Sequence, residues 1–313
     1  MNPVKRLIYM IQVIILSGCT FGDEPGVCPY NLRLDYWYAG SSSENVLPVY
    51  VDNLRQYLFD GTGKLLGVTM LRGDSIRSWQ TSLPEGDYTV VLWGNCAEDG
   101  SDNLSVLSPS GTELSGMKLS AVTDAAVAGY RGNTSRLYYG NYAFHVEEGQ
   151  SFRQQVYLSH AHASLHVTVQ WMVDAPPEGG IYRMRMKGLP AEYGFGKGWE
   201  SDPQTGGGSY TVPYINTSVL NHETRASMNY DGEVIGEFVT FRYTSNTHQY
   251  WSLWRDDERI IGDLDLHRFF SKKAMNMDEN IEQEFEILVT VYKDKIVVSE
   301  VTESDWDEGG TIG

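Results

Sequence analysis

Three histidines with spacings that suit metal ligation stand near the middle of the chain. His160, His162 and His166 occur in the segment HAHASLHVTVQW, separated by apolar or small residues. Alternate residues of a β-strand face the same side, so the three imidazoles would share one face, as a zinc site can require. A metal-bound histidine usually has a hydrogen-bond partner on its other ring nitrogen, and the sequence places no carboxylate nearby on that face. We therefore interpret these metal candidates as the polar face of a strand, and expect no metal and no other cofactor.

The opposite face of the same segment is apolar, which defines the element that would position the histidines. Small and apolar residues alternate with the polar ones over twelve positions, at Ala161, Ala163, Leu165, Val167, Val169 and Trp171. A strand with one apolar and one polar face is typical of a sheet that covers a core on one side.

Residues for covalent or acid–base catalysis do not form a known pattern. The chain has no Gly-x-Ser-x-Gly elbow, and no glycine-rich phosphate loop follows a predicted strand. Adjacent carboxylates such as Asp256 and Asp257 are expected by chance on the surface of a chain with 41 acidic residues. We expect a protein that is not an enzyme.

The first cysteine closes an apolar segment at the N-terminus. Lys5 and Arg6 precede the run from 7 to 16, which is shorter than the ~20 residues needed to cross a bilayer. The run ends in Leu-Ser-Gly-Cys19, which resembles the lipobox of bacterial lipoproteins. This resemblance implies cleavage before Cys19 and acylation of its thiol. It predicts a signal peptide over residues 1–18 and a lipidated tether over 19–27.

Two further cysteines, Cys28 and Cys96, would remain after acylation of Cys19. An exported chain meets an oxidising compartment, and two remaining thiols allow one pairing. A bridge between Cys28 and Cys96 would contribute about 4 kcal/mol by restricting the unfolded chain. The other possibility is two buried thiols.

The charge of the chain excludes several classes of partner. It has 24 basic and 41 acidic residues, giving a formal net charge of −17 at pH 7. Nucleic-acid binding needs basic stripes, and electrostatic adhesion to anionic lipid needs basic clusters. We expect no nucleic-acid partner, and attachment to a membrane only through the lipid on Cys19.

Short apolar segments separated by turn residues predict an all-β fold. Residues 54–59 and 65–70 are predicted strands joined by the turn DGTGK, and residues 87–93, apolar on nearly both faces, predict an interior strand. Residues 97–135 are expected to form long loops with at most one short helix. Later strands are predicted at 210–214, 233–243, 285–292 and 295–301, and a short helix at 263–274. We expect two β-sandwich domains in tandem, over residues 28–157 and 158–313.

Several segments in a fixed order give the sequence a family resemblance. CPYNLRLDYWY, LRQYLFDGTGKLLG, LPEGDYTVVLWGN and YLSHAHASLHVTV follow the lipobox, and DW stands near the C-terminus. In this order they resemble the FimB/Mfa2 family of fimbrial anchor lipoproteins of Bacteroidetes. The resemblance implies transthyretin-like sandwiches, lipidation at Cys19 and a cell-surface location at the outer membrane. It also implies fimbrial shaft subunits as partners and a role in anchoring fimbriae and in their assembly or length control.

One tripeptide and two other functions remain open. Arg72, Gly73 and Asp74 resemble an integrin-binding motif, although glycine and aspartate at a turn serve the same backbone need. A shaft or tip subunit of the same fimbriae would share the fold. A surface glycan-binding lipoprotein would instead display exposed tryptophan and tyrosine side chains on a flat platform.

Overall fold

The structure is a computed structural model that describes residues 30–40, 43–97, 101, 103–107, 113–125, 129–172, 179–196, 199–201, 208–210, 220–228, 232–245, 247–272, 277, 280 and 282–301. The predicted signal peptide, the tether with Cys19, and Cys28 lie outside these residues. Within the described part of the chain, no helix is long and apolar enough to cross a membrane.

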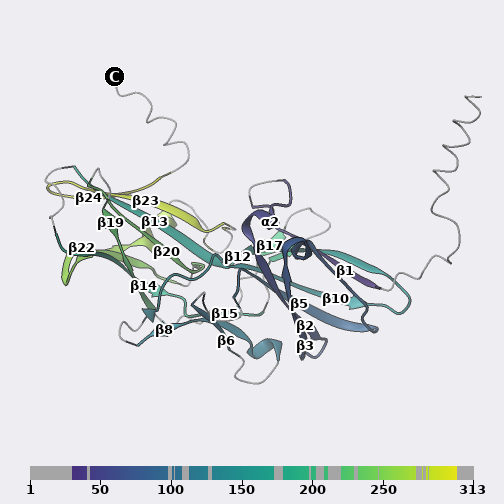
Figure 1. Ribbon diagram of the computed structural model, residues 1–313. Helices are drawn as coiled ribbons and strands as arrows, with labels where there is room; N and C mark the ends of the chain where they lie inside the picture. The colour runs from purple at the N-terminus through teal and green to yellow at the C-terminus, as the bar shows by residue number, and fades with distance from the viewer. Residues whose placement is uncertain are drawn as a thin grey trace, which may run out of the picture.

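An N-terminal sandwich is built from two sheets that face each other. The smaller sheet has the order β11–β1–β4 and the larger the order β12–β10–β5–β2–β3. Figure 1 shows them at the end of the molecule where β1 lies. The strands are β1 Leu32–Trp37, β2 Asn53–Asp60, β3 Leu65–Arg72, β4 Ser78–Thr81, β5 Gly86–Gly94, β10 Tyr138–Val146, β11 Phe152–Tyr157 and β12 Ser159–His160. Short helical turns, α2 Leu47–Tyr50 and η1 Gly73–Arg77, lie beside them.

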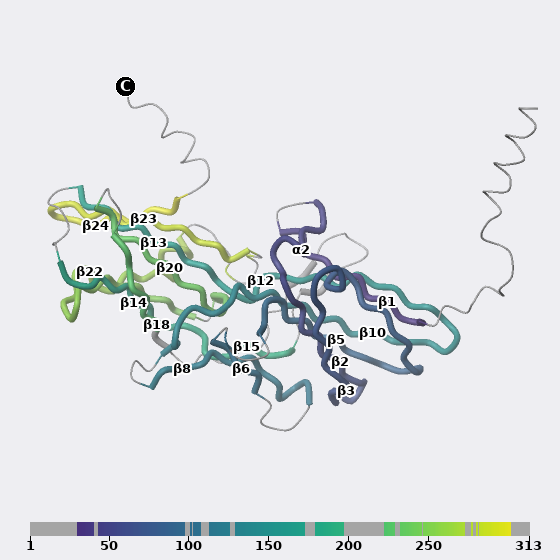
Figure 2. Tube along the Cα trace, viewed as in Figure 1, coloured from purple at the N-terminus to yellow at the C-terminus, as the bar shows by residue number. Residues whose placement is uncertain are grey.

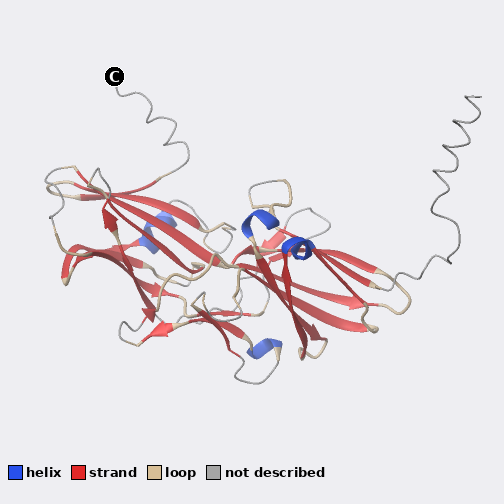
Figure 3. Cartoon of the chain, viewed as in Figure 1, coloured by secondary structure: helices blue, strands red, loops and turns tan. Residues whose placement is uncertain are grey.

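A C-terminal sandwich follows, again with two sheets. One has the order β19–β20–β13–β23–β24 and the other β22–β21–β14–β18–β9–β8. The strands are β8 Thr123–Asp124, β9 Gly129–Tyr130, β13 His162–Trp171, β14 Tyr182–Leu189, β18 Leu220–Arg225, β19 Ser227–Met228, β20 Val234–Phe241, β21 Tyr250–Arg255, β22 Glu258–Asp265, β23 Glu284–Val291 and β24 Ile296–Glu300. Helix α3, Leu266–Lys272, buries Leu266 and Phe270 against this sandwich. The predicted all-β class, with tandem sandwiches and one short C-terminal helix, is confirmed (Figure 3).

The interior strand predicted around residues 87–93 is confirmed by its place in the sheet. β5 lies between β10 and β2. Val90 and Leu92 belong to the core of the N-terminal sandwich, whereas Val91 and Trp93 belong to a second core on the opposite face. Two cores therefore explain why this strand is apolar on both faces.

The second core is closed by a small sheet with the order β15–β7–β6. Its strands are β6 Leu104–Leu107, β7 Lys118–Ala121 and β15 Glu192–Gly194, with the 3₁₀ turn η2 Leu114–Gly116 nearby and a separate pair β16 Trp199–Ser201 and β17 Gly208–Tyr210. The expectation of loops with at most one short helix over 97–135 was wrong, because β6 to β9 lie there. These strands have two to four residues, and β7 and β9 pair with β15 and β18, which lie far along the chain.

The chain passes from the first sandwich to the second at Ala161. His160 ends β12, which pairs with β10, and His162 begins β13, which pairs with β20. In Figure 2 β12 lies between the two groups of strands. The predicted boundary between residues 157 and 158 stays a proposal, since β12 still belongs to the first sheet and β8 and β9 already belong to the second.

The predicted hairpin at residues 60–64 shows how the sequence sets local structure. Asp60 Oδ1 accepts hydrogen bonds from the backbone N–H groups of Thr62 and Lys64, at 2.9 and 3.0 Å. Gly63 adopts φ +83°, a conformation that other residues rarely take. The turn therefore depends on an aspartate and a glycine at these positions.

Candidate functional site

Two of the three predicted histidines lie where the sandwiches meet. His160 and His162, on either side of Ala161, have exposed fractions of 4% and 0%. Their rings stack with centroids 4.5 Å apart. His166 lies further along β13, is only half-buried, and is not part of this pair. The expected polar strand face was therefore wrong for His160 and His162, because other segments from both sandwiches cover this end of the strand.

His160 joins a group from each sandwich. Its Nε2 lies 2.7 Å from the hydroxyl of Tyr38, which follows β1, and its Nδ1 contacts the carbonyl oxygen of Glu282, which precedes β23. A carbonyl can only accept, so Nδ1 carries the hydrogen and Nε2 accepts from Tyr38. This neutral form satisfies both nitrogens. Burial and the charge of His162 lower the pKa of His160 to about 2, so the ring is neutral at physiological pH.

His162 also joins the two sandwiches. Its Nδ1 lies 2.8 Å from the carbonyl oxygen of Leu137, just before β10, and its Nε2 lies 3.2 Å from Oε1 of Glu284 in β23. The ring of His162 therefore lies between an acceptor of the N-terminal sandwich and a carboxylate of the C-terminal sandwich.

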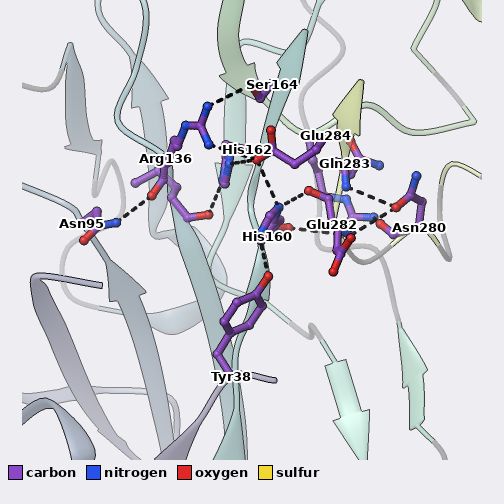
Figure 4. A network of polar contacts seen from close by, with 12 residues as sticks. Tyr38, Asn95, Arg136, His160, His162, Ser164, Asn280, Glu282, Gln283 and Glu284 are labelled. Atoms are coloured by element: carbon purple, nitrogen blue, oxygen red, sulfur yellow. Dashed lines mark hydrogen bonds and ion pairs between the residues drawn. The ribbon is translucent and has the colours of Figure 1, made fainter. Parts of the chain in front are cut away.

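Glu284 is held in its charged form by its neighbours. Burial alone would raise its pKa, but the hydrogen bond and charge of His162, with the guanidinium of Arg136, lower the pKa below its usual value. Arg136 Nη1 lies 3.6 Å from Oε1 of Glu284. Figure 4 shows these side chains converging between the sandwiches.

The possibility of a metal site must be considered again, because the structure places the carboxylate of Glu284 beside the histidines. His160, His162 and Glu284 offer ligand atoms within 4.8 Å of one another. However, the Nε2 atom of His160 already accepts from the hydroxyl of Tyr38, the Nε2 atom of His162 already faces the carboxylate of Glu284, and Arg136 approaches the same carboxylate. Metal binding would require breaking these contacts, so the arrangement favours a network of hydrogen bonds and ion pairs that joins the two sandwiches. The expectation of no metal stays a prediction.

Two further buried polar side chains, Arg242 and Gln283, extend this network beyond the histidines. Arg242, with no exposed surface, donates to the carbonyl oxygens of His160 at 3.2 Å and Asn280 at 2.9 Å. The amide of Gln283 accepts from the backbone N–H of Tyr243 at 2.6 Å and donates to its carbonyl at 2.8 Å. A buried charge is costly unless it is hydrogen-bonded, so these contacts hold the segment before β23 against the chain after β20. We call Tyr38, Arg136, Leu137, His160, His162, Arg242, Glu282, Gln283 and Glu284 the junction.

Of the two cysteines predicted to form a disulfide, only Cys96 belongs to the described residues. Cys96 is 2% exposed and follows Asn95, whose side chain donates to the carbonyl of Arg136 at 3.0 Å, beside the junction. Cys28 lies outside the described residues. β1 begins at Leu32, opposite Thr81 and Phe152, at the end of the sandwich away from the junction. A bridge from Cys28 to Cys96 would need the preceding segment to turn back along the sandwich, and it stays a prediction for non-reducing peptide mapping.

The Arg72-Gly73-Asp74 motif lies on the surface where β3 ends and η1 begins. All three residues are exposed, and Gly73 has φ +57°. Ser75 Oγ accepts from the N–H of Arg72 at 2.9 Å and donates to its carbonyl at 2.7 Å. This accounts for the turn by local bonding, and an adhesive role stays a proposal.

Sequence reasoning missed Tyr38, Arg242 and Glu284 as partners of the histidines. Glu284 reaches His162 because β23 lies parallel to β13, with Glu284 opposite Ser164. These residues are 120 positions apart, and no local pattern gives that register. In the sequence, the apolar pattern at 285–292 indicates the strand that follows Glu284, but it does not indicate which strand lies beside it.

Comparisons with known proteins agree with this architecture. The family model of fimbrillin-A associated anchor proteins Mfa1 and Mfa2 matches residues 24–287. A comparison with curated protein sequences finds no match. The solved structure of the fimbrial anchor protein Mfa2 from Porphyromonas gingivalis is similar at 16% identity and a TM-score of 0.62, covering 87% of this chain and 95% of that one.

Two structures from Bacteroides thetaiotaomicron are similar to the same degree. A candidate adhesin has 16% identity and a TM-score of 0.65, covering 88% of this chain and 98% of its own. A candidate polysaccharide-binding protein has 15% identity and a TM-score of 0.65, covering 87% and 98%. At such identities the structures establish the fold alone, whereas the family model covers most of the sequence. The chain therefore belongs to the family of fimbrillin-A associated anchor proteins.

Proposed function

We propose that this protein is a non-enzymatic lipoprotein that anchors a fimbrium to the outer membrane and assists its assembly or length control. The lipid on Cys19 would hold the N-terminal end, and fimbrial shaft subunits would bind the folded body at the cell surface. Family membership supports a fimbrial role. The lipobox-like sequence ending at Cys19 supports the attachment.

The junction is the observation that carries the proposal. An anchor must pass a pulling force from the fimbrium to the lipid without letting its domains separate. His160 and His162 each hold one group of the N-terminal sandwich and one group of the C-terminal sandwich. The backbone itself continues from β12 into β13 across the same point. A load on one sandwich would therefore reach the other through covalent chain and buried polar contacts together.

The arrangement of β1 and β2 also favours an anchor over a shaft subunit. By family resemblance, shaft subunits lose their lipidated first strand to an arginine-directed protease. The nearest arginines here are Arg33, in β1 between β11 and β4, and Arg55, in β2 between β5 and β3. Proteases cut exposed loops far more readily than paired strands. We infer that the chain keeps its lipidated end.

Mass spectrometry of the protein from fimbriated cells tests this function. We expect an acylated N-terminus at Cys19, its loss in Cys19→Ala, and release of fimbriae into the medium by cells with that variant. Ser17→Ala, which leaves the acylated thiol in place, is the matched control. A lipid-free mature protein beginning at Leu34 or Gln56 would instead identify a shaft subunit.

A further inference from the structure

One face of the C-terminal sandwich collects positive charge on an otherwise acidic protein. β14 directs Tyr182, Met184 and Met186 into the core, so its alternate residues Arg183, Arg185 and Lys187 lie on the outer face. Residues opposite one another in a sheet share a face. On one neighbouring strand Arg225 lies opposite Arg183. On the other side Trp254 lies opposite Arg183, and Arg259 lies opposite Trp254 on the next strand. We call these five basic residues with Trp254 and Tyr250 the cationic face.

The charge of this face departs from that of the whole chain. Among the described residues this face holds five basic but only three acidic side chains, Glu223, Asp263 and Asp265, whereas the whole chain has 24 basic and 41 acidic residues. Glu223 pairs with both Arg183 and Arg185, and Asp263 pairs with Lys187 at 3.1 Å and Arg259 at 3.7 Å. Asp265 is engaged in capping α3 through the N–H of Arg268. Arg225 is exposed and takes part in no ion pair among the described residues. Positive charge therefore remains in excess.

Aromatic rings fix the geometry of the guanidinium groups. The guanidinium carbon of Arg185 lies 4.1 Å from the ring centre of Trp254, and that of Arg259 lies 6.0 Å from the same ring. Trp254 is itself held by a 3.0 Å hydrogen bond from Nε1 to Ser252 Oγ. Stacked arginines keep their donors in place for planar oxyanions such as carboxylates. Tyr250, opposite Lys187, adds an exposed ring beside them.

The make-up of the face indicates the kind of partner. Stable protein–protein interfaces have an apolar core, whereas the large apolar groups among the described residues of this face are its two aromatic rings. Four neighbouring strands give a surface roughly 14 Å wide that suits an extended chain. We propose that the cationic face binds an anionic polysaccharide, whose carboxylate or sulfate groups pair with the arginines while sugar rings lie against Tyr250.

This binding does not depend on the anchoring function, and direct measurement tests it. The full-length chain in detergent is to be titrated with polygalacturonate, dextran sulfate, neutral dextran and poly-L-glutamate at about 50 and about 500 mM NaCl. We expect binding to one or both anionic polysaccharides, none to neutral dextran, and weakening at the higher salt. The polysaccharide that binds identifies carboxylate or sulfate as the preferred group.

Two variants of equal charge make the result specific to the face. The first combines Lys187→Gln, Arg225→Gln and Arg259→Gln, and the second combines Arg77→Gln, Lys272→Gln and Lys293→Gln, three exposed residues elsewhere. We expect the first to weaken binding about tenfold and the second less than about twofold. Equal loss in both variants, or no binding of either anionic polysaccharide, would overturn the proposal. If poly-L-glutamate bound more tightly than both anionic polysaccharides, the partner of this face would be an acidic polypeptide and not a polysaccharide.

Discussion

Nε2 of His162 lies 3.2 Å from Oε1 of Glu284, while the other ring nitrogen of His162 faces the carbonyl of Leu137. The histidine thus holds two acceptors that belong to different sandwiches. The neighbouring His160 also joins the two sandwiches. Its Nε2 accepts from the hydroxyl of Tyr38, and its Nδ1 donates to the carbonyl of Glu282. Two stacked rings of the same residue type therefore contact different pairs of groups, each with one member in either sandwich.

Replacement of His162 by alanine is expected to destabilise the fold by about 2 kcal/mol, since the Leu137 carbonyl and the Glu284 carboxylate both lose a partner. Equilibrium unfolding in urea measures the change. His166→Ala, on the same strand but half-buried and outside the junction, should stay within about 0.5 kcal/mol. A double-mutant cycle with Glu284→Gln should give a coupling of at least about 0.5 kcal/mol. Additive effects of the two substitutions would contradict the pairing.

Acid is expected to weaken the fold at pH values where most carboxylates are still ionised. The pKa of His160 is lowered to about 2 and that of His222 to about 4, in both cases chiefly by burial. Below pH 6.5 the unfolded chain binds protons that these folded residues do not, so stability falls with pH. The loss should approach about 1.4 kcal/mol per pH unit for each histidine down to about pH 4. The lowered pKa of Glu284 adds a loss at still lower pH.

Urea unfolding at a series of pH values from 7.5 to 4.5 checks this slope. His160→Gln retains an amide that can donate to Glu282 and accept from Tyr38, but it does not titrate. This variant should show about half the slope of the original chain. A free energy of unfolding that is flat over the range would show that both histidines titrate alike in the folded and unfolded chains.

The local features of the fold follow from the sequence more closely than the junction does. The turn at 60–64 and the strand at 87–93 depend on residues within a few positions, such as Asp60, Gly63 and Trp93. The alternation around His162 correctly indicates a strand. It does not reveal that the chain changes sheets at Ala161, nor that β23 brings Glu284 beside β13. Pairings between distant segments decide which polar residues become buried, and they have no local signature.

Elemental analysis should find less than one equivalent of zinc, copper or nickel in protein purified without a histidine tag. The reason is that the Nε2 atoms of His160 and His162 are already engaged by the hydroxyl of Tyr38 and the carboxylate of Glu284, which Arg136 also approaches. Addition of zinc should therefore leave the thermal midpoint of the original chain and of His162→Ala unchanged relative to their metal-free forms. One full equivalent of metal that disappears in His162→Ala, but persists in His166→Ala, would make the junction a metal site.

Limited digestion by trypsin should spare Arg33 and Arg55 in the folded chain. Both belong to strands with a partner on each side, and Arg33 is further held to Asp35 at 2.8 Å. Cleavage there requires the sheets to open, whereas exposed basic residues such as Arg72 and Arg77 lie at a turn between strands. N-terminal sequencing of early fragments should find cuts at exposed positions outside β1 and β2. Substitution of Asp35 by alanine removes the contact with Arg33 but leaves the strand paired, so the site should remain resistant. Early fragments beginning at Leu34 or Gln56 would mean that the first strands open readily, as a subunit that sheds its lipidated end requires.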